Sequence, residues 1–196
     1  MQKIIGVDLD EVLAEFVDYA LVHHDYKIYG KTVKREDIVN YYIHKMVEYD
    51  LDAKQAMERF RTAMLEDKDK LEVLPVTGAI EGLKKLKDKG YILKIVTARV
   101  SDLFGEYTQK WIDKHYPNIF EEIVFANHSL AKEDKPKSEL CKEHGIFHMI
   151  EDNPDYALDL AENGILTYLL EKPWNKLRPE THENLIKVKS WDEVNF

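Results

Sequence analysis

Cysteine is nearly absent from this chain of 196 residues, in which Cys141 stands alone. A single cysteine excludes an internal disulfide framework and a cysteine-rich zinc site. Long apolar runs are also missing, since no stretch approaches the roughly 18 residues needed to cross a bilayer. The N-terminus reaches Asp8 and Asp10 without the apolar core of a signal peptide. We therefore expect a soluble, cytoplasmic protein that has no membrane partner.

Basic residues are in the minority, with 28 Lys and Arg against 37 Asp and Glu, which gives a formal net charge of −9 at pH 7. An acidic surface disfavours binding along a phosphate backbone, so a nucleic-acid polymer is not an expected partner. The 8 histidines offer no metal-binding pattern, because the HExxH spacing is absent. Hydrophobic residues make up 44% and charged residues 33%, a balance typical of an ordinary globular domain.

Short apolar runs alternate with helical patterns along most of the chain, which is typical of an α/β fold with a parallel sheet. The expected strands are 3–7, 91–97, 122–126, 147–151 and 165–170. Helices are expected at 79–89, 102–115 and 137–144, and another begins at Pro154. The C-terminal stretch 174–196 is expected to pack against the edge of this domain.

The stretch between the first two expected strands differs, because it contains helical patterns and no convincing strand. Three helices are expected there, over 11–29, 35–47 and 52–66. In the third, Met57, Phe60 and Met64 form an i, i+3, i+7 stripe, which predicts a helical core, with a substrate surface as the alternative. We therefore expect an inserted helical subdomain at 16–71 and a main domain made of 1–15 and 72–196.

Polar clusters follow three of the expected strands: Asp8-Leu9-Asp10, Thr97-Ala98-Arg99 and Glu151-Asp152-Asn153. Each cluster alone has a simpler explanation, such as a solvated turn or, for Asn153, a helix N-cap. In an open parallel sheet, however, the carboxyl ends of the strands line one crevice, which is the usual ligand site. Three such clusters at one edge therefore favour a functional site.

Carboxylates that converge in this way repel one another and favour a neutralising cation. Oxygen ligands without cysteine or clustered histidine indicate Mg²⁺ rather than zinc or copper, and Mg²⁺ commonly binds together with a substrate phosphate. Asp8 is then a candidate nucleophile, and Asp10 a candidate general acid. Thr97 and a lysine would bind the oxygens of the transferring phosphoryl group.

These residues resemble a known family. The segment Asp8 to Leu13, the run Ile95-Val96-Thr97, a lysine within 135–137 and the run Ile150-Glu151-Asp152 are similar, in this order, to the motifs of the haloacid dehalogenase superfamily. The resemblance covers essentially the whole chain. Within the superfamily, DLDEVLAEF and the stretch from Thr97 through Trp111 to Phe125 look most like the type C 5′(3′)-deoxyribonucleotidase group.

The resemblance implies a Rossmann-like parallel sheet flanked by helices, with a small helical cap inserted after the first strand. It also implies a Mg²⁺-dependent phosphomonoester hydrolase that acts through an aspartyl-phosphate on a small phosphorylated metabolite, such as a (deoxy)nucleoside monophosphate. Asp8 matches the nucleophile and a metal ligand. Asp10 matches the acid/base residue, whose backbone carbonyl also binds the metal, and Asp152 matches the remaining carboxylate ligand.

Further roles follow from the same resemblance. Thr97 matches the phosphate-binding hydroxyl, with Ala98 and Arg99 beside it as candidates for substrate binding. Phe16 falls where an aromatic ring contacts the base, and its alternative is helix core. Lys137 is favoured over Lys135 as the phosphate-binding lysine.

Two acidic residues complicate the match. Glu11 stands where many relatives carry glycine, and it adds a negative charge near the metal site. Glu151 is expected to be a weak ligand or an outer partner of the metal.

Two other functions compete with a nucleotidase. One is a phosphatase for sugar or other metabolite phosphates, since the cap sets specificity. The other is a catalytically silent relative that binds a metal or a partner, although such a protein would be expected to lack Asp8, Asp10 or the lysine.

Overall fold

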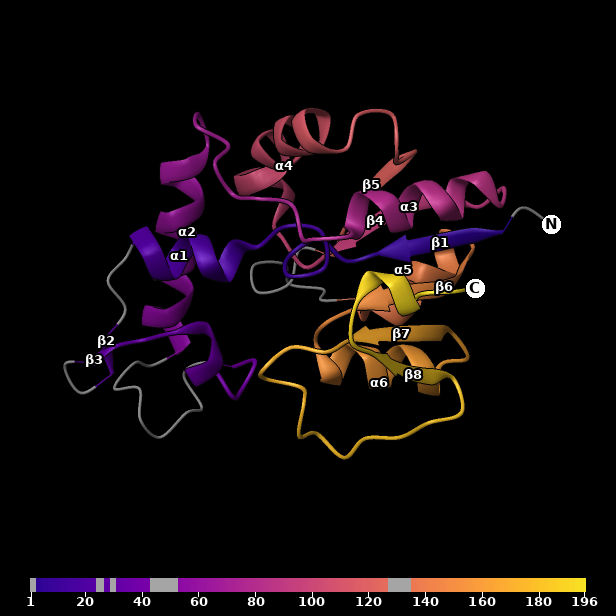
Figure 1. Cartoon of the computed structure of the whole chain (residues 1–196). Helices are drawn as coiled ribbons and strands as arrows, with labels where there is room; N and C mark the ends of the chain where they lie inside the picture. Colours follow the sequence, from indigo (N-terminus) through magenta and orange to yellow (C-terminus); the bar gives the residue numbers. More distant parts are fainter. Residues whose placement is uncertain (1–2, 24–26, 29–30, 43–52, 127–134) are drawn as a thin grey trace.

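The computed structural model describes residues 3–23, 27–28, 31–42, 53–126 and 135–196. Its centre is a six-stranded sheet in the order β5-β4-β1-β6-β7-β8, in which every neighbouring pair is parallel. Figure 1 shows these strands one below another, from β5 at the top to β8 at the bottom. The strands are β1 (Ile4–Val7), β4 (Ile92–Thr97), β5 (Glu122–Phe125), β6 (Ile146–Glu151), β7 (Leu166–Leu170) and β8 (Leu185–Val188).

The middle strand, β1, is apolar because β4 and β6 pair with it on both sides and other elements cover it. Ile5 and Val7 are fully buried, as expected for a parallel strand that is covered on both faces. Gly6 is required by packing, since a Cβ atom there would lie 2.6 Å from the sulfur of Met149 and 3.0 Å from Ile146 on β6. This close approach of β6 brings the ends of the two strands together.

Outside the inserted segment, the described residues form four helices between consecutive strands, and these agree with the helices expected from the sequence to within a few residues. Asn153 caps the last of them, with its side-chain oxygen accepting hydrogen bonds from the backbone N–H groups of Asp155 and Tyr156. The alternation of strands and helices confirms the α/β Rossmann-like fold. The helices are α3 (Ala79–Asp88), α4 (Ser101–His115), α5 (Lys137–Glu143) and α6 (Pro154–Glu162).

The C-terminal stretch does more than pack against the edge of the domain. It adds β8 to the sheet, parallel to β7, and then the short 3₁₀ helix η3 (Trp191–Glu193). Trp191 is buried, and its indole N–H donates to the backbone oxygen of Val12. The sequence analysis did not identify β8 as a strand, because its four residues alternate poorly between apolar and polar.

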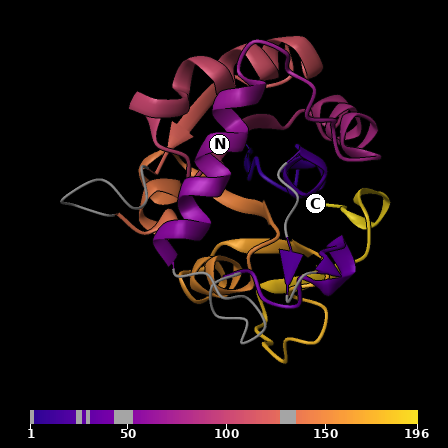
Figure 2. The same ribbon diagram turned by 90° about the vertical axis from the view of Figure 1, so that its left-hand side faces the viewer.

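The segment inserted after β1 contains α1 (Phe16–His23), η1 (Arg35–Asp37) and α2 (Ala53–Asp67). Figure 1 shows α1 and α2 to the left of the sheet, on the side where β1 ends, and Figure 2 shows α2 crossing in front of the sheet when viewed from that side. The helix expected over 52–66 is confirmed as α2. The boundaries of the inserted subdomain, 16–71, stay a prediction.

Three expectations for this segment need correction or fall outside the described residues. The helix expected over 11–29 begins only at Phe16, because Glu11 has a left-handed φ of 66° that a helix cannot accommodate. A short antiparallel pair, β2 (Lys27–Ile28) with β3 (Lys31–Thr32), lies where no strand was expected, since two-residue strands show no readable alternation. The helix expected over 35–47 is wrong for the described residues: only 35–37 are helical, as η1, because the backbone leaves the helical region at Ile38 (φ −84°, ψ 84°). Residues 43–52 lie outside the described part.

The inserted segment and the sheet share one hydrophobic core, which includes Phe16, Ile38 and Met64 as well as Ile5 and Val7. Met64 therefore packs as the stripe on the third helical pattern predicts, whereas the side chains at positions 57 and 60 lie outside the described part of the structure. Among the described residues, we find no helix that is long and apolar enough to span a bilayer.

Candidate active site

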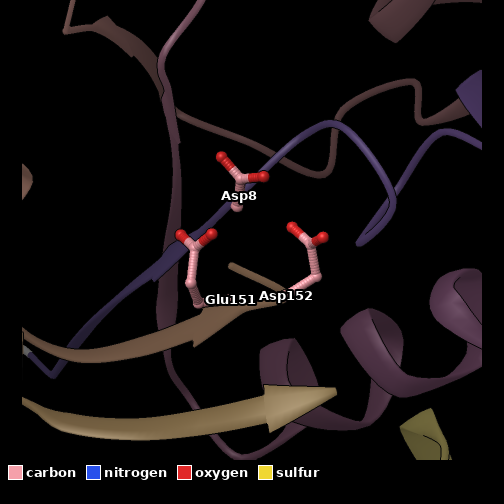
Figure 3. Close-up of side chains that lie close together, drawn as sticks. All are labelled: Asp8, Glu151 and Asp152. Carbon is pink, nitrogen blue, oxygen red and sulfur yellow. The ribbon is translucent and has the colours of Figure 1, made fainter. Parts of the chain in front are cut away.

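Three buried carboxylates lie together at the carboxyl ends of β1 and β6. The backbone N–H of Asp8 donates to the oxygen of Ile150 over 2.9 Å, which continues the strand pairing past Val7. Glu151 ends β6 and Asp152 follows it. Each of the three side chains offers a carboxylate oxygen within 4.8 Å of the others, as Figure 3 shows. The parallel register of two adjacent strands thus produces the acidic cluster.

Lys137, the first residue of α5, supplies a positive charge to this cluster. Its Nζ donates to Asp8 Oδ1 over 2.6 Å and to Glu151 Oε2 over 2.8 Å, and the side chain is 1% exposed. The Nζ also lies 4.9 Å from the centre of the Tyr156 ring. Lys135 is 45% exposed, and its Nζ donates to Glu143 over 2.6 Å. The structure therefore brings Lys137, rather than Lys135, to Asp8.

The end of β4 lies beside the end of β1, because Val7 pairs with Ile95 in the sheet. Thr97 is buried there, and its hydroxyl oxygen accepts a hydrogen bond from the backbone N–H of Arg99 over 3.2 Å. Ala98 between them is partly exposed. The sheet thus places the second polar cluster next to the first.

Arg99 holds the side chain of Asp10. Its Nη2 donates to Asp10 Oδ1 over 2.6 Å and its Nε to Asp10 Oδ2 over 3.0 Å, while its Nη1 donates to the hydroxyl of Thr108 over 3.0 Å. Such a two-point pair holds the carboxylate in one orientation. The sequence analysis proposed Arg99 for substrate binding, and in this structure its guanidinium contacts Asp10.

Glu11 points toward the inserted segment. One of its carboxylate oxygens accepts the backbone N–H of Val17 in the first turn of α1 over 2.6 Å, and the other pairs with Arg35 of η1. The φ of Glu11 is 66°, a left-handed conformation that glycine adopts most readily. The two polar partners show what this glutamate does instead: it ties the loop after β1 to α1 and η1.

The aromatic side chains of Phe16 and Tyr41 have different surroundings. Phe16 is 2% exposed, belongs to the hydrophobic core and stacks with Tyr19 at 6.5 Å between ring centres. Tyr41 is close enough to the acidic cluster that its pKa is raised well above the ordinary value, first by burial and then by the charges of Asp152 and Asp8. The sequence analysis did not select Tyr41, since no motif surrounds it.

Two consecutive residues after β7 contact Asp152, and the sequence analysis did not identify them. The indole N–H of Trp174 donates to Asp152 Oδ2 over 2.9 Å. The side-chain N–H of Asn175 donates to the backbone oxygens of Asp152 and Leu170, each over 2.8 Å. Nothing local in the sequence indicates the two contacts with Asp152, because they join segments more than twenty positions apart.

The electrostatics of the cluster favour an additional positive charge. Burial raises the pKa of Asp8 to about 8, with Glu151 adding to the rise and Lys137 opposing it. Burial also raises the pKa of Asp152 well above its ordinary value, and the charges of Glu151 and Asp8 reinforce the rise. A divalent cation between the carboxylates would relieve this repulsion, and an all-oxygen donor set fits a hard cation.

Comparisons with known proteins give a family match and a similar curated protein. A family model described as 5′ nucleotidase, deoxy (Pyrimidine), cytosolic type C protein matches residues 2–195. A nucleotidase of Clostridium acetobutylicum is 26% identical over 195 residues, which cover 97% of this chain and 90% of the relative.

Solved structures share the fold. A protein described as a predicted phosphatase from Clostridium acetobutylicum superimposes with a TM-score of 0.67 at 17% identity, covering 98% of this chain and 96% of that one. CbbY from Rhodobacter sphaeroides, solved in complex with phosphate, superimposes with a TM-score of 0.61 at 16% identity, with the same coverage of 98% and 96%. These likenesses confirm the fold expected from the sequence, and the family match confirms the resemblance seen in the motifs.

Proposed function

The chain belongs to the family of cytosolic type C 5′ nucleotidases and is a phosphoric monoester hydrolase, and on this premise we propose that it hydrolyses (deoxy)nucleoside monophosphates with Mg²⁺. The observation that carries the proposal is the buried contact of Lys137 with Asp8 beside Glu151 and Asp152. A lysine, a candidate nucleophile and candidate metal ligands thus meet at one point. The name of the nucleotidase relative supports a nucleotide as the substrate.

The carboxylates of Asp8 and Asp152 and the backbone carbonyl of Asp10 would hold the magnesium ion. Glu151 suits an outer role, because one of its carboxylate oxygens accepts from Lys137 Nζ and the other from the backbone N–H of Asn153. Bound Mg²⁺ would neutralise negative charge and polarise the phosphoryl oxygens.

The chain's own residues then divide the reaction into two displacements. A carboxylate oxygen of Asp8 attacks phosphorus, the ester P–O bond breaks, and Asp10 gives a proton to the leaving oxygen. Water next attacks the aspartyl-phosphate and passes a proton to Asp10, which releases inorganic phosphate and restores Asp8. Lys137 and the hydroxyl of Thr97 bind the phosphoryl oxygens in both steps.

The proposal is tested first with p-nitrophenyl phosphate, with and without Mg²⁺ and in excess chelator. We expect chelation to abolish activity and Mg²⁺ to restore it, whereas full activity in excess chelator would contradict the magnesium site. Asp8→Asn is the negative control for contaminating phosphatase.

The substrate class is tested by ranking nucleoside 5′- and 3′-monophosphates and sugar phosphates by kcat/KM. We expect a (deoxy)nucleoside monophosphate to rank first. If a sugar phosphate ranks first, the enzyme is a metabolite phosphatase of the same fold and the nucleotide proposal is wrong.

A further inference from the structure

Asp152 is held from outside the acidic cluster by consecutive residues of the segment after β7. Trp174, which is 3% exposed, donates its indole N–H to Asp152 Oδ2 over 2.9 Å. Asn175 donates to the backbone oxygen of the same aspartate over 2.8 Å. Within the described part of the chain, Oδ1 of Asp152 receives no hydrogen bond, so one oxygen is held and the other is available to a cation.

The indole of Trp174 is itself held by the inserted segment. The guanidinium of Arg35 lies 5.4 Å from the centre of the Trp174 ring. The same guanidinium pairs with Glu11, in the loop that follows β1, and with Asp18 of α1 over 2.8 Å. Arg35 therefore joins three separate elements at the rim of the site.

From these contacts we propose that Trp174 is a positioning residue for Asp152 and that Arg35, by stacking on the indole, couples the inserted segment to the metal site. The inference rests on the proposed magnesium-dependent function and adds to it. The N–H bond selects the orientation of the carboxylate and directs its other oxygen to the ion. Outer partners of this kind are known to tune metal affinity by about 10- to 100-fold.

The test measures the binding of Mg²⁺ alone, as the rise in melting temperature with Mg²⁺ concentration in the absence of substrate. Trp174→Phe keeps an aromatic ring at this position and removes the N–H donor together with part of the ring. We expect it to raise the apparent Kd for Mg²⁺ by about 10- to 100-fold. A wild-type Mg²⁺ dependence in this variant would overturn the positioning role.

Trp111→Phe is the matched control. Trp111 is equally buried, and its indole N–H donates over 2.9 Å to the backbone oxygen of Val73, away from the acidic cluster. We expect this variant to lower the melting temperature as Trp174→Phe does, while its Mg²⁺ affinity stays within about twofold of wild type. An equal loss of Mg²⁺ affinity in both variants would show that Trp174 acts only through packing.

Arg35→Met tests whether Arg35 couples the inserted segment to the metal site. It leaves the indole N–H of Trp174 in place, so this test can be made even if Trp174→Phe fails to fold. We expect it to weaken Mg²⁺ binding by about two- to fivefold, the size of one cation–π contact. Unchanged Mg²⁺ affinity would refute the coupling. A wild-type protein whose melting temperature and activity both ignore Mg²⁺ would instead overturn the magnesium site and this inference with it.

Discussion

The sheet and the segment inserted after β1 hold their functional side chains in different ways. In the sheet, β1 is hydrogen-bonded on both sides, and the register of β1 with β6 alone brings Asp8 to Glu151 and Asp152. The position of these carboxylates follows from backbone hydrogen bonds, which are numerous and cooperative. Substitutions of these carboxylates that leave the strands intact should therefore change catalytic activity without displacing the other residues of the site.

In the inserted segment, individual polar contacts of side chains add to the hydrophobic core that it shares with the sheet. Asp67, at the end of α2, is fully buried and accepts hydrogen bonds from the backbone N–H of Glu72 over 2.7 Å and from the hydroxyl of Tyr107 over 2.8 Å. Arg35 and Glu11 form a second connection. The comparison teaches that the acidic cluster lies on the cooperative part of the fold, whereas the described part of the inserted segment is fixed to it partly by single side-chain contacts.

The largest effect is expected from Asp8→Asn, which removes the proposed nucleophile from the sheet. Turnover of p-nitrophenyl phosphate should be lost and no phospho-enzyme should form, because an amide cannot take the place of the carboxylate in attack on phosphorus. Intact-mass measurement after rapid quenching in acid checks the second point. An added phosphoryl group in this variant would exclude Asp8 as the nucleophile.

Asp10→Asn should lower the rate by about 10²–10⁴-fold, the usual range for a general acid–base group. With p-nitrophenyl phosphate, whose leaving group needs little protonation, the first displacement should survive and the phospho-enzyme should accumulate, since the attacking water has lost its base. The same mass measurement detects it. Turnover at the wild-type rate would show that Asp10 is not the acid/base residue.

In the inserted segment, Phe16→Ala tests the buried ring. Its burial predicts a loss of about 3–5 kcal/mol in the free energy of unfolding, measured by urea denaturation. Burial of the ring also predicts that, at temperatures where the variant is folded, activity on nucleotides and activity on p-nitrophenyl phosphate fall by the same factor. A loss of about 1–3 kcal/mol confined to nucleotides would place the ring against the base instead.

Asp67→Asn should cost about 1.5–3 kcal/mol of unfolding free energy, because one charged acceptor of buried hydrogen bonds is lost. Asp69→Asn is the control, since Asp69 is exposed on the following turn. If the two variants unfold at the same urea concentration, the buried contact does not hold the segment in place.

The smallest effect is expected at Cys141, which lies on α5 and is fully buried. Burial raises the pKa of its thiol to about 12, so the reactive thiolate is scarce at neutral pH. A disulfide reagent should leave the folded protein unmodified at pH 7 and label it fully in urea. Rapid labelling of the folded protein would show that this region opens.

The sequence by itself determined the strands β1, β4, β5, β6 and β7, the helices between them and the acidic residues at the carboxyl ends of β1 and β6. The physical reason is local: apolar runs indicate buried parallel strands, and parallel strands bring their carboxyl ends to one edge. The alignment of the carboxyl ends of parallel strands predicted that Asp8 would lie near Asp152. The order of the motifs along the chain indicated the family.

The tertiary structure alone decided which side chains contact one another across the site. Lys135 and Lys137 have similar neighbours in sequence, yet only the start of α5 brings Lys137 to Asp8, 129 positions away. The contacts of Arg99 with Asp10 and of Trp174 with Asp152 also join distant segments. Such contacts depend on how the elements pack, and a long side chain reaches several partners, so no local pattern specifies which partner it finds.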